Sequence, residues 1–190
     1  MAHTLPRSRM PQVAAVVLAL GGLALPAHAA VYWTPKTLLP DYFKTAEKIT
    51  FRTITLPDAD VAAIAGKLGV APDKLKTSWS VYFGLVGGAR TGYAILDAEI
   101  GLHEPIDFGV RFVDKGPVSR LEIMEFREPY GDGVRDARFR DQFVGKTAND
   151  RLTAGQDIAI VSGASISSRS VAFGVKRDAL VLQAALKNGL

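Results

Sequence analysis

The strongest constraint on the fold of this chain is a succession of strand patterns between residues 78 and 126, followed by helical patterns. The expected strands cover residues 78–86, 91–100, 106–113 and 118–126. In the third of them every second residue is a large apolar one, which is the period of a half-buried strand (Ile106, Phe108, Val110, Phe112). Because the strands follow one another with short breaks, an antiparallel meander fits best.

The last of these strands alternates imperfectly. Leu121 and Ile123 belong to one face, whereas Met124 and Phe126 belong to the other. A β-bulge or a strand covered on both faces would explain this pattern. We expect the turn that leads into this strand at residues 114–117.

Helical patterns dominate the remainder of the chain. Phe139 and Phe143 are four residues apart in a polar segment, which predicts a short helix with one apolar edge. We expect a loop over residues 145–155 and a brief buried strand over residues 158–161. The last segment places apolar side chains on one face of a long helix (Val171, Val175, Ala179, Leu182, Leu186). Strands in succession followed by helices predict an α+β domain, an antiparallel sheet with flanking helices.

The residues before the first strand divide into a leader and a helical lead-in, residues 30–77. In the lead-in we expect a short amphipathic helix with Asp58 as its N-cap and Gly69 just past its end. The leader, residues 1–29, has a basic start, an apolar stretch too short to span a bilayer and a small-x-small motif that ends at Ala29. These are the parts of a secretory signal peptide. We therefore expect cleavage near Ala29 and a periplasmic protein.

The residue inventory excludes several classes of function. The chain has no cysteine, so it has no disulfide partner, thiolate metal site or attached c-type haem. Two of its three histidines lie in the leader, and the remaining one, His103, cannot form a multi-histidine metal site. Basic and acidic residues alternate without a basic stripe, so we expect no nucleic-acid partner.

One segment combines small residues and hydroxyl groups at a helix start. It reads Ser162, Gly163, Ala164, Ser165, Ile166, Ser167, Ser168. Unpaired backbone N–H groups and the helix dipole at such a place favour an anion such as phosphate by about 0.3–1 kcal/mol. Helix capping explains the same serines more simply, since serine is a preferred N-cap residue.

This segment resembles the Ser-Gly-Ala-Thr-x-Ser/Thr signature of the FMN-binding domain family, which includes flavin-carrying subunits of sodium-pumping NADH:quinone reductases and Rnf complexes. In that family FMN is joined through its phosphate to the signature threonine, and Ser165 stands in that place here. Three further blocks follow the family's order, at residues 101–106, 125–131 and 139–146. The resemblance covers about residues 82–182, and the expected FMN-binding domain is 78–187. Leu102 stands where a lysine is usual.

The resemblance implies an FMN site. It places covalent attachment at Ser165, among Ser162, Gly163, Ala164, Ser167 and Ser168. It also places His103, Glu104, Arg127 and Glu128 near the flavin, although an ordinary ion pair between Arg127 and Glu128 explains those two equally well. We expect Tyr130, Phe139 and Phe143 to be packing residues, and Lys146 is a candidate partner of the phosphate.

The implied function is electron transfer outside the cytoplasm by a flavoprotein that carries FMN and is not a stand-alone catalyst. The implied partners are a flavin transferase that takes FMN from FAD, and membrane-bound or periplasmic redox proteins. One alternative is a non-catalytic module that binds an anion or a lipid headgroup without covalent flavin. Another is a serine hydrolase, in which residues 163–167 imitate a nucleophile elbow, but Ser167 replaces its final glycine.

Overall fold

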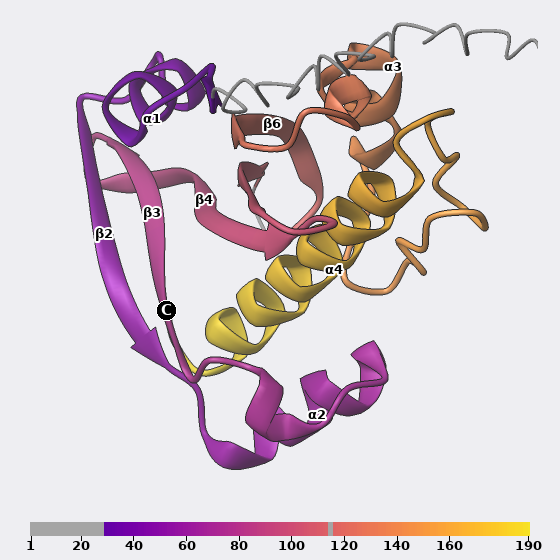
Figure 1. Ribbon diagram of the computed structural model, residues 1–190. Helices are drawn as coiled ribbons and strands as arrows, with labels where there is room; N and C mark the ends of the chain where they lie inside the picture. Colours follow the sequence, from indigo (N-terminus) through magenta and orange to yellow (C-terminus); the bar gives the residue numbers. More distant parts are fainter. Residues whose placement is uncertain (1–28, 114–115) are drawn as a thin grey trace, which may run out of the picture.

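The computed structural model describes residues 29–113 and 116–190, which form a six-stranded sheet covered by helices (Figure 1). The strands are β1 (Ala30–Val31), β2 (Lys48–Thr55), β3 (Ser78–Val86), β4 (Ala89–Ile100), β5 (Pro105–Phe112) and β6 (Val118–Phe126). The helices are α1 (Pro35–Tyr42), α2 (Asp58–Leu68), α3 (Ala137–Arg140) and α4 (Ser165–Lys187), with short 3₁₀ turns η1 (Pro72–Lys74), η2 (Asp132–Arg135) and η3 (Asp141–Phe143). The predicted leader before Ala29 and the turn residues 114 and 115 lie outside the described residues.

The predicted antiparallel meander is confirmed, and the strand order is β1-β6-β5-β4-β3-β2. The imperfect alternation of β6 has both of the expected causes. Asp107 pairs with Glu125 but Phe108 pairs with Ile123, so that Met124 is an extra residue in a bulge. Met124 also packs under α1, on the face of the sheet opposite α4. The fold is therefore α+β, as predicted.

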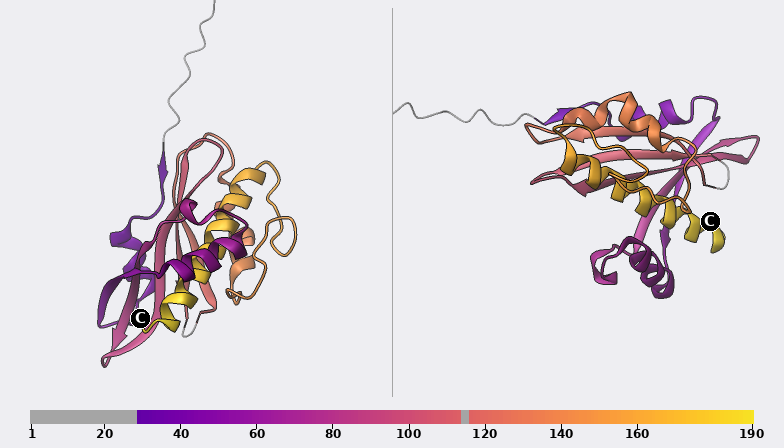
Figure 2. Two further views of the ribbon diagram at one scale, coloured as in Figure 1. Left: turned by 90° about the horizontal axis from the view of Figure 1, so that it is seen from below. Right: turned by 90° about the vertical axis from the view of Figure 1, so that its right-hand side faces the viewer.

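The larger hydrophobic core lies between the sheet and α4, which crosses one face of the sheet (Figures 1 and 2). The alternating apolar residues of β5 all point into this core and are fully buried (Ile106, Phe108, Val110, Phe112). α4 packs against β5 at Gly174, where any Cβ atom would collide with the ring of Phe108. This close packing requires glycine inside the helix, because glycine has no Cβ atom.

A second, smaller core lies between α1 and the other face of the sheet (Figure 2). Leu38 and Tyr42 are buried there, and the Tyr42 hydroxyl donates a hydrogen bond of 2.6 Å to the Gly109 carbonyl. A Cβ atom at Gly109 would lie 2.7 Å from Leu38, so this glycine lets α1 approach the sheet. Both faces of the sheet are thus covered.

The lead-in contains the expected helix, α2, but also contributes β1, α1 and β2, which the sequence analysis does not predict. Gly69 ends α2 in the left-handed conformation with φ of 71°, as expected. Asp58 is not the N-cap, because Pro57 occupies that position and Asp58 is the first helical residue, where its charge suits the helix dipole.

The chain between the sheet and α4 differs in part from expectation. Phe139 and Phe143 lie in α3 and η3 with ring centroids 5.3 Å apart, and both are buried as predicted. Residues 158–161 do not form a strand of the sheet. Only Ile158 is buried there, and it makes an isolated bridge to Ala154 within the same loop. Among the described residues, no helix has the length and apolar character needed to cross a membrane.

Candidate functional site

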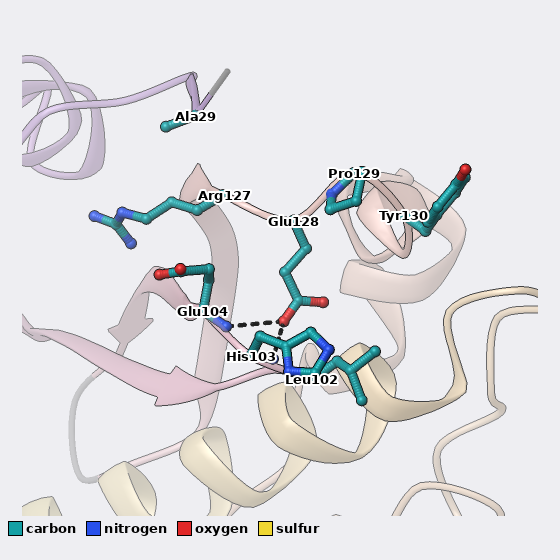
Figure 3. Close-up of a pocket in the computed structure, with 8 residues that line it drawn as sticks. All are labelled: Ala29, Leu102, His103, Glu104, Arg127, Glu128, Pro129 and Tyr130. Carbon is teal, nitrogen blue, oxygen red and sulfur yellow. Dashed lines mark hydrogen bonds between the residues drawn. The ribbon is translucent and has the colours of Figure 1, made fainter. Parts of the chain in front are cut away.

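A cleft of about 720 Å³ opens where β5 begins and β6 ends (Figure 3). It is lined by Ala29, Leu102, His103, Glu104, Arg127, Glu128, Pro129 and Tyr130. The structure therefore brings His103, Glu104, Arg127 and Glu128 together, although the two pairs are more than twenty residues apart in sequence.

Glu128 holds one wall of this cleft in place. Its Oε1 atom accepts hydrogen bonds from the backbone N–H groups of His103 at 2.6 Å and Glu104 at 3.0 Å. Figure 3 shows the Glu128 side chain reaching across to this loop. A Cβ atom at Gly101 would lie 2.7 Å from the same oxygen, so the carboxylate fits only against a glycine. Glu128 is thus a positioning residue for the loop that carries His103.

Arg127 does not form the ion pair with Glu128 that was the alternative explanation. Its guanidinium lies 2.7 Å from both Asp107 and Glu125 and also donates to the Pro105 carbonyl at 2.9 Å. The hydrogen bond to Asp107 raises the pKa of Arg127 further above its already high value. The guanidinium points away from Glu128 in Figure 3. Arg127 therefore borders the cleft while its charge is neutralised by these two carboxylates.

The serine segment forms the start of α4, and its serines do not cap the helix. The N-cap residue is Ala164, no side chain caps the first turn, and Ser165 is the first helical residue. Gly163 precedes them with φ of 77°, and a Cβ atom built there would meet nothing within 4 Å. The explanation of these serines as N-caps is thus wrong. The N–H groups of the first turn have no side-chain acceptor among the described residues.

The hydroxyl groups of this segment fall into two classes. Ser162 and Ser165 are exposed, whereas Ser167 and Ser168 are buried. The Ser168 hydroxyl donates to the Ala164 carbonyl at 2.8 Å and accepts from the Val161 N–H at 3.2 Å, which closes the turn before the helix. Ser168 therefore has a structural role.

Ser167 connects the start of α4 to the cleft. A Cβ atom at Gly131 would lie 2.5 Å from the Ser167 hydroxyl oxygen, so these two residues are in direct contact. Gly131 follows Tyr130, which lines the cleft. Tyr130 is 82% exposed, so the prediction that it is a packing residue is wrong. The adjacent proline and glycine, which break the strand there, are the signal that could have indicated an exposed loop.

Two residues near the serine segment have roles that the sequence does not reveal. Gln142 accepts a hydrogen bond from the Ala159 N–H at 2.6 Å and so fixes the loop before α4. Lys146, the candidate phosphate partner, lies 3.1 Å from the carboxylate of Asp157. Asp157 in turn accepts from backbone N–H groups of the same loop. Lys146 thus supports the loop.

Comparison with known proteins gives a family and a fold. Residues 101–179, which contain the cleft loops and the start of α4, match the FMN-binding domain family. The crystal structure of Shewanella oneidensis NqrC is similar, with a TM-score of 0.53 and 15% sequence identity over 79% of this chain and 88% of that chain. No curated protein matches the chain significantly in sequence. Residues 101–179 therefore match the FMN-binding domain family, and the fold of the chain is similar to that of NqrC.

Proposed function

We propose that this protein carries FMN joined through its phosphate to Ser165 and transfers electrons outside the cytoplasm. The observation that carries the proposal is the position of the Ser165 hydroxyl. It is exposed on the first residue of α4, whereas Ser167 is packed against Gly131 and Ser168 is engaged in the turn. Ser162 is also exposed, but it precedes the helix and lies outside its first turn.

The residues around Ser165 fit a phosphate group. The uncapped N–H groups of the first turn of α4 are hydrogen-bond donors, and the positive end of the helix dipole attracts negative charge. Gly163 leaves room beside them. Ile166 is 42% exposed next to Ser165 and offers an apolar contact to a ligand attached there.

The cleft beside the helix start fits a flat ring. Leu102, Pro129 and Tyr130 give it apolar surface, and its volume of about 720 Å³ lies in the range of cofactor sites. When bound, FMN supplies the uptake and release of electrons. His103 lies on the wall that Glu128 holds in place and lines the space proposed for the ring.

The proposal includes a location and partners. The leader expected in residues 1–29 would direct the protein to the periplasm, where covalent attachment prevents loss of the cofactor. A flavin transferase would join FMN from FAD to Ser165, and a membrane-bound or periplasmic redox protein would exchange electrons with it.

The attachment is tested by co-expression with a flavin transferase, followed by intact-mass measurement of the protein. We expect the wild type to gain the mass of one FMN minus water, and Ser165→Ala to gain none, because a phosphoester needs the hydroxyl. Ser165→Thr should load at least as well, since a β-branched side chain holds its hydroxyl in fewer rotamers.

Ser162→Ala is the matched control, because it removes the other exposed hydroxyl of the segment and should keep at least part of the loading. Covalent flavin on Ser165→Ala, or none on the wild type with active transferase and FAD present, would contradict the proposal. The second outcome would favour a module that binds an anion or a lipid headgroup. The hydrolase alternative gains no support, since the strand of a nucleophile elbow is absent from residues 158–161.

A further inference from the structure

A second cleft lies between the end of α2, the loop after Ala148 and the middle of α4. It consists of two adjoining hollows of about 410 and 500 Å³. Lys67, Arg151, Thr153 and Lys176 line both hollows, which makes them parts of one depression. None of its lining residues lines the cleft with His103.

Four positive charges from three elements border this second cleft. They belong to Lys67 of α2, Arg151 of the loop, and Arg169 and Lys176 of α4, and we call the depression the basic cleft. Within residues 29–113 and 116–190, none of the four side chains forms an ion pair. The cleft also contains Asp150, whose carboxylate accepts from the N–H of Thr147 at 2.8 Å and from its hydroxyl at 2.9 Å. The basic cleft therefore carries excess positive charge.

Lys176 lies deepest in this arrangement. Its ammonium donates to the carbonyls of Ala148, at 2.8 Å, and Asp150, which leaves the third of its donors for a ligand. Burial, followed by the charge of Lys67, lowers the pKa of Lys176, and the charges of Asp150 and Asp157 act in the opposite direction. A bound anion would add a further favourable contact to this ammonium.

The floor of the basic cleft is apolar. Leu68, Ala172 and Phe173 contribute to it, together with Leu152, which is 2% exposed. Leu152 has φ of 52°, the only positive value at a non-glycine residue in the described chain. Asp157 holds this conformation by accepting from the N–H groups of Leu152 at 3.0 Å and Thr153 at 2.7 Å. The left-handed backbone of Leu152 is strained, and the hydrogen bonds to Asp157 hold it in that conformation. Strained backbone conformations of this kind cluster at ligand sites.

We propose that the basic cleft binds an organic phosphate, with the phosphate among the four cations and an apolar body against Leu68 and Phe173. The excess positive charge of the cleft favours an anionic ligand, and its apolar floor favours an anion that also carries a hydrophobic group. The site does not depend on flavin at Ser165, although Arg169 lies one helical turn after that residue.

The test is calorimetric titration of the flavin-loaded protein and of Ser165→Ala with 1-naphthyl phosphate. We expect both to bind it, and inorganic phosphate to bind at least tenfold more weakly because it lacks the apolar body. Arg169→Gln and Lys67→Gln should each weaken binding by tenfold or more. Arg138→Gln is the matched control, since it removes an exposed cation of α3 that does not line the basic cleft.

Several outcomes would overturn this proposal. They are unchanged affinity in Arg169→Gln and Lys67→Gln, equal affinity for inorganic phosphate, or loss of binding in the flavin-loaded protein, which would assign the cleft to the flavin.

Dihexanoyl phosphatidylglycerol below its micellar concentration serves as a second probe. Tighter binding of this lipid, with the same loss in both variants, would identify a lipid headgroup as the source of the phosphate. Tighter binding of naphthyl phosphate would identify a free ester. Flavin loading is measured separately, so failure here leaves the attachment test unaffected.

Discussion

At the scale of single residues, Asp178 of α4 stands out because its carboxyl group is fully buried and has no hydrogen-bond partner among the described residues. The charged groups that face it are Asp97 of β4, Arg177 and Lys76. Lys76 lies 2.6 Å and Arg177 3.1 Å from the Asp97 carboxylate, whereas Arg177 is 3.7 Å from Asp178. Burial and the charge of Asp97 raise the pKa of Asp178, so it is the protonated partner. Burial would also raise the pKa of Asp97, but Arg177 and Lys76 lower it.

This assignment predicts how stability depends on pH. A carboxyl whose folded-state pKa is raised contributes stability below its unfolded pKa of about 4, and this stability is lost as pH rises through the folded value. Asp178→Asn keeps the shape of the side chain but cannot ionise. We therefore expect a larger gain in the free energy of unfolding at pH 8 than at pH 5, measured by urea denaturation.

Asp97→Asn is the control, because it changes the other carboxyl of the pair. It leaves Arg177 and Lys76 without that counter-charge and should destabilise the protein by roughly 3–5 kcal/mol, the cost of breaking a buried ion pair. If the two variants had the same effect at both pH values, the assignment of the proton to Asp178 would be wrong.

At the scale of elements, the contact between α4 and β5 depends on Gly174. Gly174→Ala gains about 1 kcal/mol in helix propensity but drives a methyl group into the Phe108 ring, an overpacking cost of about 1–3 kcal/mol. We expect a net loss in the free energy of unfolding. Gly66→Ala in α2 is the matched control, since a Cβ atom there meets nothing within 4 Å, and it should stabilise by about 0.5–1 kcal/mol. Stabilisation by both changes would contradict the close packing.

Sequence analysis predicts those elements in which burial of one face gives the apolar residues a regular spacing along the chain. β5 and the apolar face of α4 are of this kind, since each residue's place on its element decides whether it is buried. The predicted strand over residues 158–161 fails because the buried Ile158 is isolated and Gln142 holds the next residue, a contact that no local pattern records. β2 has only partial burial on both faces and so lacks a strong alternation.

The candidate site is predictable to a similar degree. The serine segment and the cleft loops resemble blocks of the family, and this resemblance identifies residues that line the cleft and the start of α4. It places the attachment at Ser165 but does not reveal the structural role of Ser168, because that role depends on which hydroxyl the fold buries. It also cannot show that Glu128 binds two backbone N–H groups 24 and 25 residues earlier, since such a contact exists only after β5 and β6 pair.

At the scale of the whole molecule, the lead-in is part of the same folding unit as the sheet, since α1 covers one face and every residue of β2 pairs with β3. Leu38→Ala should therefore destabilise the whole protein by about 2–5 kcal/mol, because Leu38 is fully buried between α1 and the sheet. We expect one transition, with the same midpoint by tryptophan fluorescence and by far-UV circular dichroism.

Leu102→Ala is the control for this change, because Leu102 is 54% exposed and its loss should shift the midpoint little. Separate transitions for the two probes in Leu38→Ala would instead show that the lead-in unfolds independently of the sheet.

The two borders of the sheet are protected to very different degrees. Along β6, residues 30 and 31 pair with its end, Gly145 and Lys146 bond to Val118, and Arg140 bonds to the Leu121 carbonyl. Along β2, the described chain offers no further strand, and Phe51 is 57% exposed. Unpaired backbone groups on a border strand are a template for another chain, and the positive charges of Lys48 and Arg52 discourage a second copy of this basic strand. The long open border at which a further strand would extend this sheet, in a crystal, a complex or an aggregate, is therefore β2.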